Sequence, residues 1–175
     1  GAKIEGKHEV ETTAMFIHAA VHRVAGKRCV LHTHMPYATA LTLTTERKLD
    51  TRLSQNAMRF HGRVGVDDQY NGFANSAAEG ERIAYSLRNK TCPGSFHDVC
   101  FLGNHGVIVC GERLDHAYVD LYYLERSCQA QVLALLTGYP LAPASDEIAV
   151  AVCQQTIQDC KQSELFFKAL GRTLK

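Results

Sequence analysis

Apolar residues recur at helical or strand spacing along most of the chain, and they predict alternating helices and strands. A first helix over 12–24 is predicted by apolar positions at three- and four-residue steps: Phe16, Ile17, Ala20, Val21 and Val24. Thr12 or Thr13 would cap this helix. After Gly26, the run CVLHTH (29–34) predicts a short buried strand, and Pro36 opens a helix to about residue 42.

The middle of the chain predicts shorter elements. We expect a short helix over 53–60, a short strand over 63–68, and a helix to about residue 88 that Ser76 and Glu79 open as a capping box. The segment 89–96, with Pro93 and Gly94, reads as a loop. DVCFLGNHGVIVCG (98–111) then predicts two strands around a turn at 103–106. Helices interleaved with such strands indicate an α/β or α+β class with one sheet.

A long helix is predicted over about 114–137, and Gly138 and Pro140 would end it. Its apolar stripe is typical of a core or an interface: Tyr118, Leu121, Leu124, Cys128, Val132 and Leu135. Glu125 and Gln129, one turn apart, are expected to face solvent or to form a salt bridge. One last helix is expected from 145–147 towards the C-terminus.

Composition indicates one compact domain over residues 1–175. A net charge of +1 makes no electrostatic case for nucleic acid or an anionic membrane as a partner. No apolar run is long enough to span a bilayer, and the polar N-terminus is unlike a signal peptide, so we expect a cytoplasmic protein. The seven cysteines form no CxxC pair, which favours reduced, mostly buried thiols over a disulfide framework or a cysteine zinc site.

Three of the nine histidines form a pattern that suits a metal. His32 and His34 share a face of the predicted strand, because residues two apart in a strand point to the same side. His105 lies in the turn between the two later strands, next to Gly106. Together they would form an N3 set with open positions for water or substrate, as in catalytic zinc sites. The HxH spacing by itself fits satisfied structural histidines equally well.

The remaining histidines suggest no chemistry. His18 and His22 lie four residues apart on the first helix and have metal-ligand spacing, but packing of one and solvation of the other explains them better. We assign no role to the others, which sit among polar or loop residues: His8, His61, His97 and His116.

The motifs VLHTHMPYATAL, FLGNHGVIVCG and LDHAYVDLYYLERSCQAQVLAL, in this order, resemble the class II (zinc-dependent) aldolase and adducin head-domain superfamily over about residues 12–136. The resemblance implies a three-layer α/β/α sandwich around a mostly antiparallel sheet. It also implies that His32, His34 and His105 are zinc ligands, with manganese as an alternative metal. Members commonly assemble as homo-oligomers, often tetramers, with the active site at a subunit boundary.

The chain departs from the family pattern beside this site. The resemblance places Thr12 and Thr13 where serines hold the substrate phosphate, but Ala14 stands where the acid/base glutamate belongs. Glu11 is therefore our candidate catalytic carboxylate, with Glu9 as a weaker one. Helix capping explains the threonines better than phosphate binding does, and the preference of acidic residues for a helix N-terminus explains Glu11 and Glu9 at least as well as catalysis does. Tyr70 and Tyr37 are further candidate proton donors. The opening GAKIEGKHEV looks like the end of the family's N-terminal region, so we expect that part of the fold to be missing.

Two functions follow from the resemblance. The first is a metal-dependent lyase that cleaves a carbon–carbon bond, by aldol cleavage or decarboxylation, in a small hydroxy-carbonyl or carboxylate substrate. The second is a non-catalytic, adducin-like module for self-association. Bound metal would separate the two, because three histidine ligands have no obvious use in a scaffold.

Overall fold

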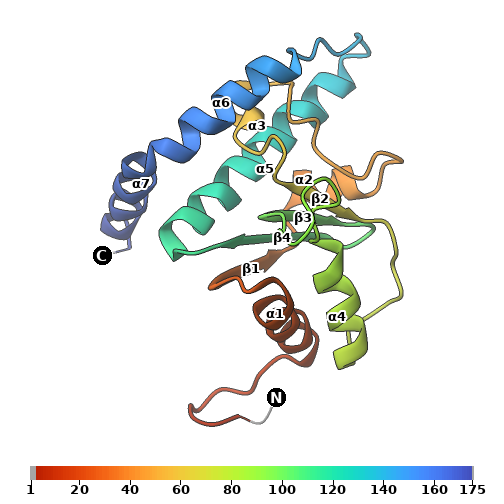
Figure 1. Cartoon of the computed structure of the whole chain (residues 1–175), viewed down its shortest axis with the longest axis vertical. Coiled ribbons are helices and arrows are strands. Elements are labelled where there is room, and N and C mark those ends of the chain that lie inside the picture. Colours follow the sequence, from red (N-terminus) through yellow and green to blue (C-terminus); the bar gives the residue numbers. More distant parts are fainter. Residues whose placement is uncertain (1–2, 175) are drawn as a thin grey trace.

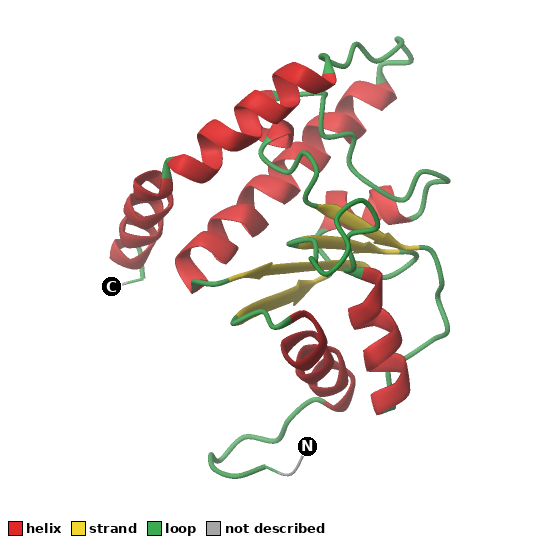
Figure 2. Ribbon diagram, in the orientation of Figure 1, coloured by secondary structure: helices red, strands yellow, loops and turns green. Residues whose placement is uncertain are grey.

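The computed structural model describes residues 3–174, without the side chain of Cys160. The chain folds into a three-layer sandwich in which helices cover both faces of one sheet (Figures 1 and 2). The helices are α1 (Thr12–Ala25), α2 (Pro36–Thr42), α3 (Gln55–Met58), α4 (Ala77–Ser86), α5 (Leu114–Leu136), α6 (Asp146–Gln158) and α7 (Cys160–Arg172). The strands are β1 (Cys29–Thr33), β2 (Val64–Asp67), β3 (Val99–Leu102) and β4 (Gly106–Gly111).

The four strands form one sheet in the order β1-β4-β3-β2. β4 pairs antiparallel with both β1 and β3, whereas β2 pairs parallel with β3. The last pairs of these ladders, Thr33 with Val107 and Leu102 with Gly106, bring the end of β1 next to the β3–β4 turn. The predicted mostly antiparallel sheet is therefore confirmed.

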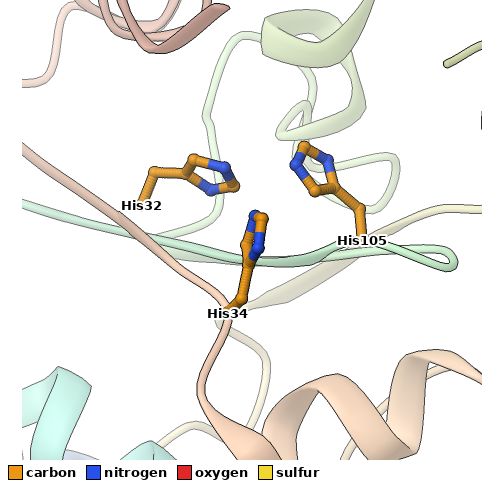
Figure 3. Close-up of side chains that lie close together, drawn as sticks. All are labelled: His32, His34 and His105. Carbon is orange, nitrogen blue, oxygen red and sulfur yellow. The ribbon is translucent and has the colours of Figure 1, made fainter. Parts of the chain in front are cut away.

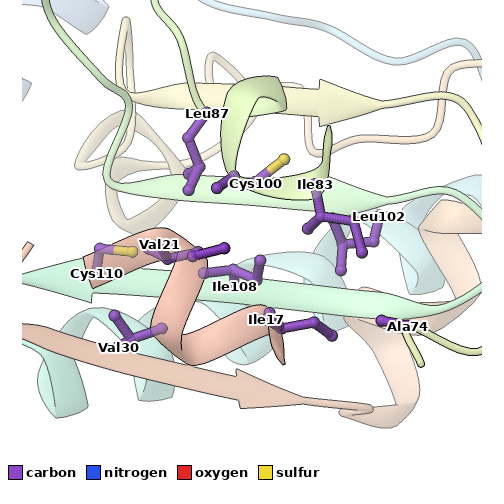
Figure 4. Close-up of a cluster of buried hydrophobic side chains, with 12 residues drawn as sticks. Ile17, Val21, Val30, Ala74, Ile83, Leu87, Cys100, Leu102, Ile108 and Cys110 are labelled. Carbon is purple, nitrogen blue, oxygen red and sulfur yellow. The ribbon is translucent and has the colours of Figure 1, made fainter. Parts of the chain in front are cut away.

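Alternating side chains of the sheet supply two hydrophobic clusters, one on each face. Towards α1 and α4, Cys100, Leu102 and Ile108 pack with Ile17 and Ile83 (Figure 4). On the other face, towards α2, α3 and α5, the buried members include Leu41, Phe60, Val99, Phe101, Val107 and Leu124. Because both faces of β3 and β4 are buried, these strands read as continuous apolar runs in the sequence.

Several predicted element ends need correction. The last helix is not continuous, because Asp159 leaves helical geometry (φ −88°, ψ 58°) and separates α6 from α7. Neither threonine caps α1: the N-cap is Glu11, whose carboxylate reaches the free backbone N–H groups of the first turn. The Ser76 hydroxyl does cap α4 by accepting from the Glu79 N–H at 3.2 Å. The Glu79 side chain, however, pairs with Arg82 instead of returning to Ser76.

A chain of charged side chains lies where β2 and β3 begin. This ionic cluster consists of Lys27, Arg59, Arg63, Asp98 and Asp120. Arg63 donates to Asp98 at 2.9 Å and to Asp120 at 2.8 Å, while Arg59 donates to Asp120 at 2.6 Å and Lys27 to Asp98 at 2.7 Å. The cluster ties the loop after α1, the start of the sheet and α5 together with paired charges.

The described cysteines are mostly buried free thiols, as the sequence predicts. Six cysteines are free thiols and four of those are buried, Cys100, Cys110, Cys128 and Cys153; the side chain of the seventh, Cys160, lies outside the description. No helix within residues 3–174 combines the length and the apolar character that crossing a membrane requires.

Candidate metal centre

The three predicted histidines converge at the end of the sheet opposite the ionic cluster. His32 belongs to β1, His34 follows its last residue, and His105 lies in the β3–β4 turn. The ring centroids are 5.2 Å apart for His32 and His34, and each lies 4.8 Å from His105. One nitrogen from each ring lies within 4.8 Å of the others, and the rings turn towards a common centre (Figure 3).

Glycine and a left-handed residue make this convergence possible. A Cβ on Gly106 would lie 2.5 Å from the Thr33 carbonyl oxygen and 2.8 Å from the His34 ring, so a larger residue would push His34 away. Asn104 adopts φ 57°, a conformation that asparagine tolerates, and it turns the chain so that His105 faces the other two histidines. The sequence pattern NHG thus encodes the tight turn and places the third candidate ligand in it.

Hydrogen bonding and burial prepare the rings as ligands. The Nδ1 of His32 lies 3.0 Å from the Val107 carbonyl oxygen, so it is the nitrogen that carries hydrogen and donates, which leaves Nε2 free. Burial, followed by the neighbouring His105 and His34, lowers the pKa of His32 to about 4, although the hydrogen bond to Val107 acts in the opposite direction. Burial, then His34, also lowers the pKa of His105. The lowered pKa values of His32 and His105 favour the neutral form of these two rings, which is the form that binds a divalent metal.

Glu11 and the threonines lie at the start of α1, and their hydrogen bonds are largely used within the helix. The Glu11 carboxylate accepts from the Thr13 N–H at 3.1 Å, from the Ala14 N–H at 2.6 Å and from the Thr13 hydroxyl at 2.7 Å. These bonds lower the pKa of Glu11, and His32 lowers it slightly more. The N–H groups that would hold a substrate anion are therefore occupied by the protein's own carboxylate.

The two candidate tyrosines are in different places. The ring of Tyr70 lies 6.2 Å from the ring of His105 and is half exposed, so its phenol lies beside the metal centre. Tyr37 instead packs against the hydrophobic cluster between the sheet and α5. His18, one turn after Ala14 on α1, lies close enough to His32 to lower its pKa.

The structure places Glu125 differently from the prediction that it faces solvent or forms a salt bridge. Its side chain is only partly exposed and has no salt-bridge partner within residues 3–174; its carboxylate oxygens accept from the backbone N–H groups of Tyr37 and Ala38, each at 2.9 Å. It therefore caps α2, the helix that starts two residues after His34. The sequence carries a hint, since Met35 at the N-cap has no side chain able to accept a hydrogen bond.

A second group of possible metal ligands already has its negative charges paired with an arginine. Asp115, His116 and Glu164 lie within ligand distance of one another where α5 and α7 meet. Arg113 donates to Asp115 at 2.6 Å and approaches Glu164 at 3.1 Å. Because a cation of the chain already pairs with both carboxylates, the histidine centre is the better metal site.

Comparisons with known proteins agree with this architecture. The model of the Class II Aldolase and Adducin N-terminal domain matches residues 1–132. The chain is 33% identical over 154 residues to "Decarboxylase NovR" of Streptomyces niveus, covering 87% of this chain and 52% of that protein. It is equally similar over 153 residues to "4-hydroxy-3-prenylphenylpyruvate oxygenase/4-hydroxy-3-prenylbenzoate synthase" of Streptomyces roseochromogenus subsp. oscitans, with the same shares covered.

A solved structure and a eukaryotic relative extend the comparison. The crystal structure of an aldolase II superfamily protein from Pseudomonas syringae superposes with a TM-score of 0.76 at 29% identity, covering 90% of this chain and 61% of that one. Human beta-adducin is 28% identical over 127 residues, which is 72% of this chain and 16% of beta-adducin. The chain spans about half the length of the two Streptomyces relatives.

Proposed function

This chain belongs to the Class II Aldolase and Adducin N-terminal domain family, and on that premise we propose that it is part of a metal-dependent carbon–carbon lyase of the decarboxylase type. The observation that carries the proposal is the convergence of His32, His34 and His105 on one point. We propose that residues 1–175 act as one domain and that the complete protein is a cytoplasmic homo-oligomer, with the tetramer as the first arrangement to test.

The three histidines would hold the metal through neutral ring nitrogens. A bound divalent ion, zinc first and manganese second, would supply Lewis-acid chemistry at an oxygen of a small carboxylate or hydroxy-carbonyl substrate. The Val107 carbonyl keeps His32 in one tautomer, so the ring offers Nε2 without reorientation. Exposure of His34 leaves the centre open to a small molecule.

Ala14 favours decarboxylation over aldol cleavage. Aldol cleavage needs a base that removes a hydroxyl proton, and an alanine side chain cannot take one. In a decarboxylation the bond to the carboxylate carbon breaks, carbon dioxide leaves, and the remaining carbon needs only a proton. The phenol of Tyr70 beside His105 is the donor that we propose. Glu11 stays the alternative, acting through water. NovR, a relative at 33% identity, carries the name decarboxylase.

The first test is the metal content of the purified protein and of the His32→Ala/His34→Ala variant. We expect near-stoichiometric metal in the wild type and none in the variant, measured by elemental analysis after dialysis. A His22→Ala/His61→Ala variant is the matched control, because it also loses two histidines but leaves the centre intact. Carbon dioxide release from 2-oxo and 2-hydroxy acids is then measured with and without oxygen, beside aldol cleavage of sugar phosphates.

The similarity to beta-adducin supports a second candidate, a self-association module without chemistry. Wild-type protein that stays free of metal after dialysis against zinc and manganese would contradict the lyase and favour this module. Sedimentation of the wild type and of the His32→Ala/His34→Ala variant would then report its assembly. Equal oligomeric states in the two proteins would show that assembly does not depend on the histidines.

A further inference from the structure

We infer that α2 acts as a bracket, meaning a rigid link that sets the positions of His34 and His105 in the metal centre. Glu125 and Arg47 are the positioning residues that hold its two ends. The inference rests on the proposed metal site. Two of the three histidines lie outside the hydrogen-bonded ladders: His34 follows the last β1 pair, and His105 lies inside the β3–β4 turn. Strand pairing alone therefore leaves the direction of these two residues open.

Glu125 holds the first end of the bracket. Its two carboxylate oxygens accept from the N–H groups of Tyr37 and Ala38 at 2.9 Å, across 88 and 87 residues of sequence. α2 begins at Pro36, and its N-cap Met35 contributes no side-chain hydrogen bond. A charge-assisted cap from α5 thus fixes the helix directly after His34.

The other end of α2 holds the turn that carries His105. The carbonyl oxygen of Thr42, the last residue of α2, accepts from the Asn104 N–H at 3.3 Å. Arg47 donates from Nη1 to the Asn104 side-chain oxygen at 2.8 Å, and the same nitrogen lies 3.5 Å from the Thr42 carbonyl. Its guanidinium fills the place that a Cβ on Gly103 would take. Arg47 therefore stabilises Asn104 in the left-handed conformation that aims His105.

The helix between these ends has little freedom to move. Ala38, Leu41 and Thr42 are at most 1% exposed, and α2 is wedged between the sheet and α5. A short helix packed so tightly acts as a spacer of constant length. One of its ends follows His34 by two residues, and the other contacts the residue before His105. The spacing of the two ligands is thus determined from the face of the sheet opposite α1.

The test compares three variants of the full chain. Glu125→Gln keeps the shape but removes the charge and one acceptor, and Arg47→Met keeps the stem but removes the fork. Gln131→Leu is the matched control: Gln131 lies on the same α5, accepts from the Asp50 N–H at 2.8 Å, and does not contact α2 through that bond. Zinc affinity is measured by competition with a chromophoric chelator, and the visible spectrum of the cobalt-substituted protein reports ligand geometry.

We expect Glu125→Gln and Arg47→Met each to weaken zinc binding by roughly tenfold and to alter the cobalt spectrum. Gln131→Leu should lower the urea midpoint and leave both metal readouts unchanged. The double variant should bind only slightly more weakly than either single variant, because both act through one helix. Arg47→Lys, which keeps the charge without the fork, is a second variant at that end and should also weaken binding.

Three results would overturn the inference in different ways. Wild-type zinc affinity and an unaltered cobalt spectrum in folded Glu125→Gln and Arg47→Met would show that α2 supports the fold alone, with the metal site intact. Wild-type protein that binds neither zinc nor cobalt would remove the metal site itself, and the bracket with it. If the losses of zinc affinity multiply in the double variant, Glu125 and Arg47 act independently and not through one rigid helix.

Discussion

The ionic cluster and the three histidines lie at opposite ends of the sheet and differ in how their polar groups are paired. At the start of β2 and β3, the ionic cluster pairs its cations and carboxylates at 2.6–2.9 Å. At the other end, His32 is the one ring of the three histidines that has a protein hydrogen-bond partner within residues 3–174. The first arrangement satisfies its charges internally, whereas the second leaves nitrogen lone pairs facing one another.

This difference separates a structural site from a binding site. A buried ion pair stabilises the fold only while both partners are present, so the ionic cluster should be sensitive to any single deletion. Three imidazoles that face one another contribute little to stability without a cation between them, and the neighbouring histidines lower the pKa of His32 and of His105. We therefore expect mutations at the ionic end to change stability, and mutations at the histidine end to change metal binding.

Removal of one carboxylate from the ionic cluster should give the largest loss of stability. In Asp120→Asn the partly buried guanidinium groups of Arg59 and Arg63 lose the charge of their shared, buried partner, which should cost about 3–5 kcal/mol of unfolding free energy. Urea unfolding measures the loss, and metal content should not change. Asp146→Asn, at an exposed partner of Arg52, is the control and should change stability little. Loss of metal in Asp120→Asn would contradict the assignment of stability to the ionic cluster and of metal binding to the histidines.

Acid should destabilise the two ends in different pH ranges. The pKa of His32 is lowered from 6.5 to about 4 in the folded state, so the unfolded chain binds more protons between these values. The unfolding free energy of metal-free protein should therefore fall as pH drops from about 6.5 to 4, by on the order of 3 kcal/mol at most. The measurement is urea unfolding at a series of pH values.

The ionic end should respond at lower pH. Burial raises the pKa of Asp98, but Arg63 and Lys27 together lower it below the ordinary 3.8. The stability that Asp98 provides is thus present above pH 3.8 and is lost as pH falls through its lower folded pKa. A His32→Asn variant should lose the largest part of the upper pH dependence, leave the smaller part that comes from the lowered pKa of His105, and keep the lower pH dependence. If the unfolding free energy of that variant still depends on pH as in the wild type between about 6.5 and 4, another group causes this dependence.

Removal of zinc by a chelator should change stability through the histidines alone, and by less than the Asp120→Asn substitution does. Free zinc at a hundred times its Kd should stabilise the wild type by about 2.7 kcal/mol, and a chelator should abolish that gain. Thermal unfolding with and without the chelator measures it. The His32→Ala/His34→Ala variant should show no zinc-dependent shift, while Asp120→Asn should keep the full shift from its lower baseline.

The smallest effect is expected from Glu11→Gln. If Glu11 serves as the cap of α1, the variant should lose a little stability and keep both metal affinity and turnover. Tyr70→Phe is its counterpart on the other side of the centre and should reduce turnover without changing metal content. A large loss of turnover in Glu11→Gln with normal turnover in Tyr70→Phe would reverse the roles that we propose.

Much of the fold could be predicted because it depends on local spacing. Apolar steps of three and four predicted α1 and α5, Pro36 predicted the start of α2, and the Ser76 cap was found in place. The interruption at Asp159 was missed because the apolar pattern continues across it. The Glu11 cap was missed because threonines are common N-caps, whereas the observed carboxylate lies one residue earlier.

The sequence by itself determined that His32 and His34 lie two residues apart at the end of a strand and that a glycine-bounded turn carries His105, because strand periodicity and turn chemistry act within a few residues. Only the tertiary structure decided that Glu125 caps α2, that Arg47 holds Asn104, and that Tyr70 instead of Tyr37 lies at the metal centre. These contacts join segments dozens of residues apart. Their partners depend on how the helices pack across the sheet, and that packing has no local signature.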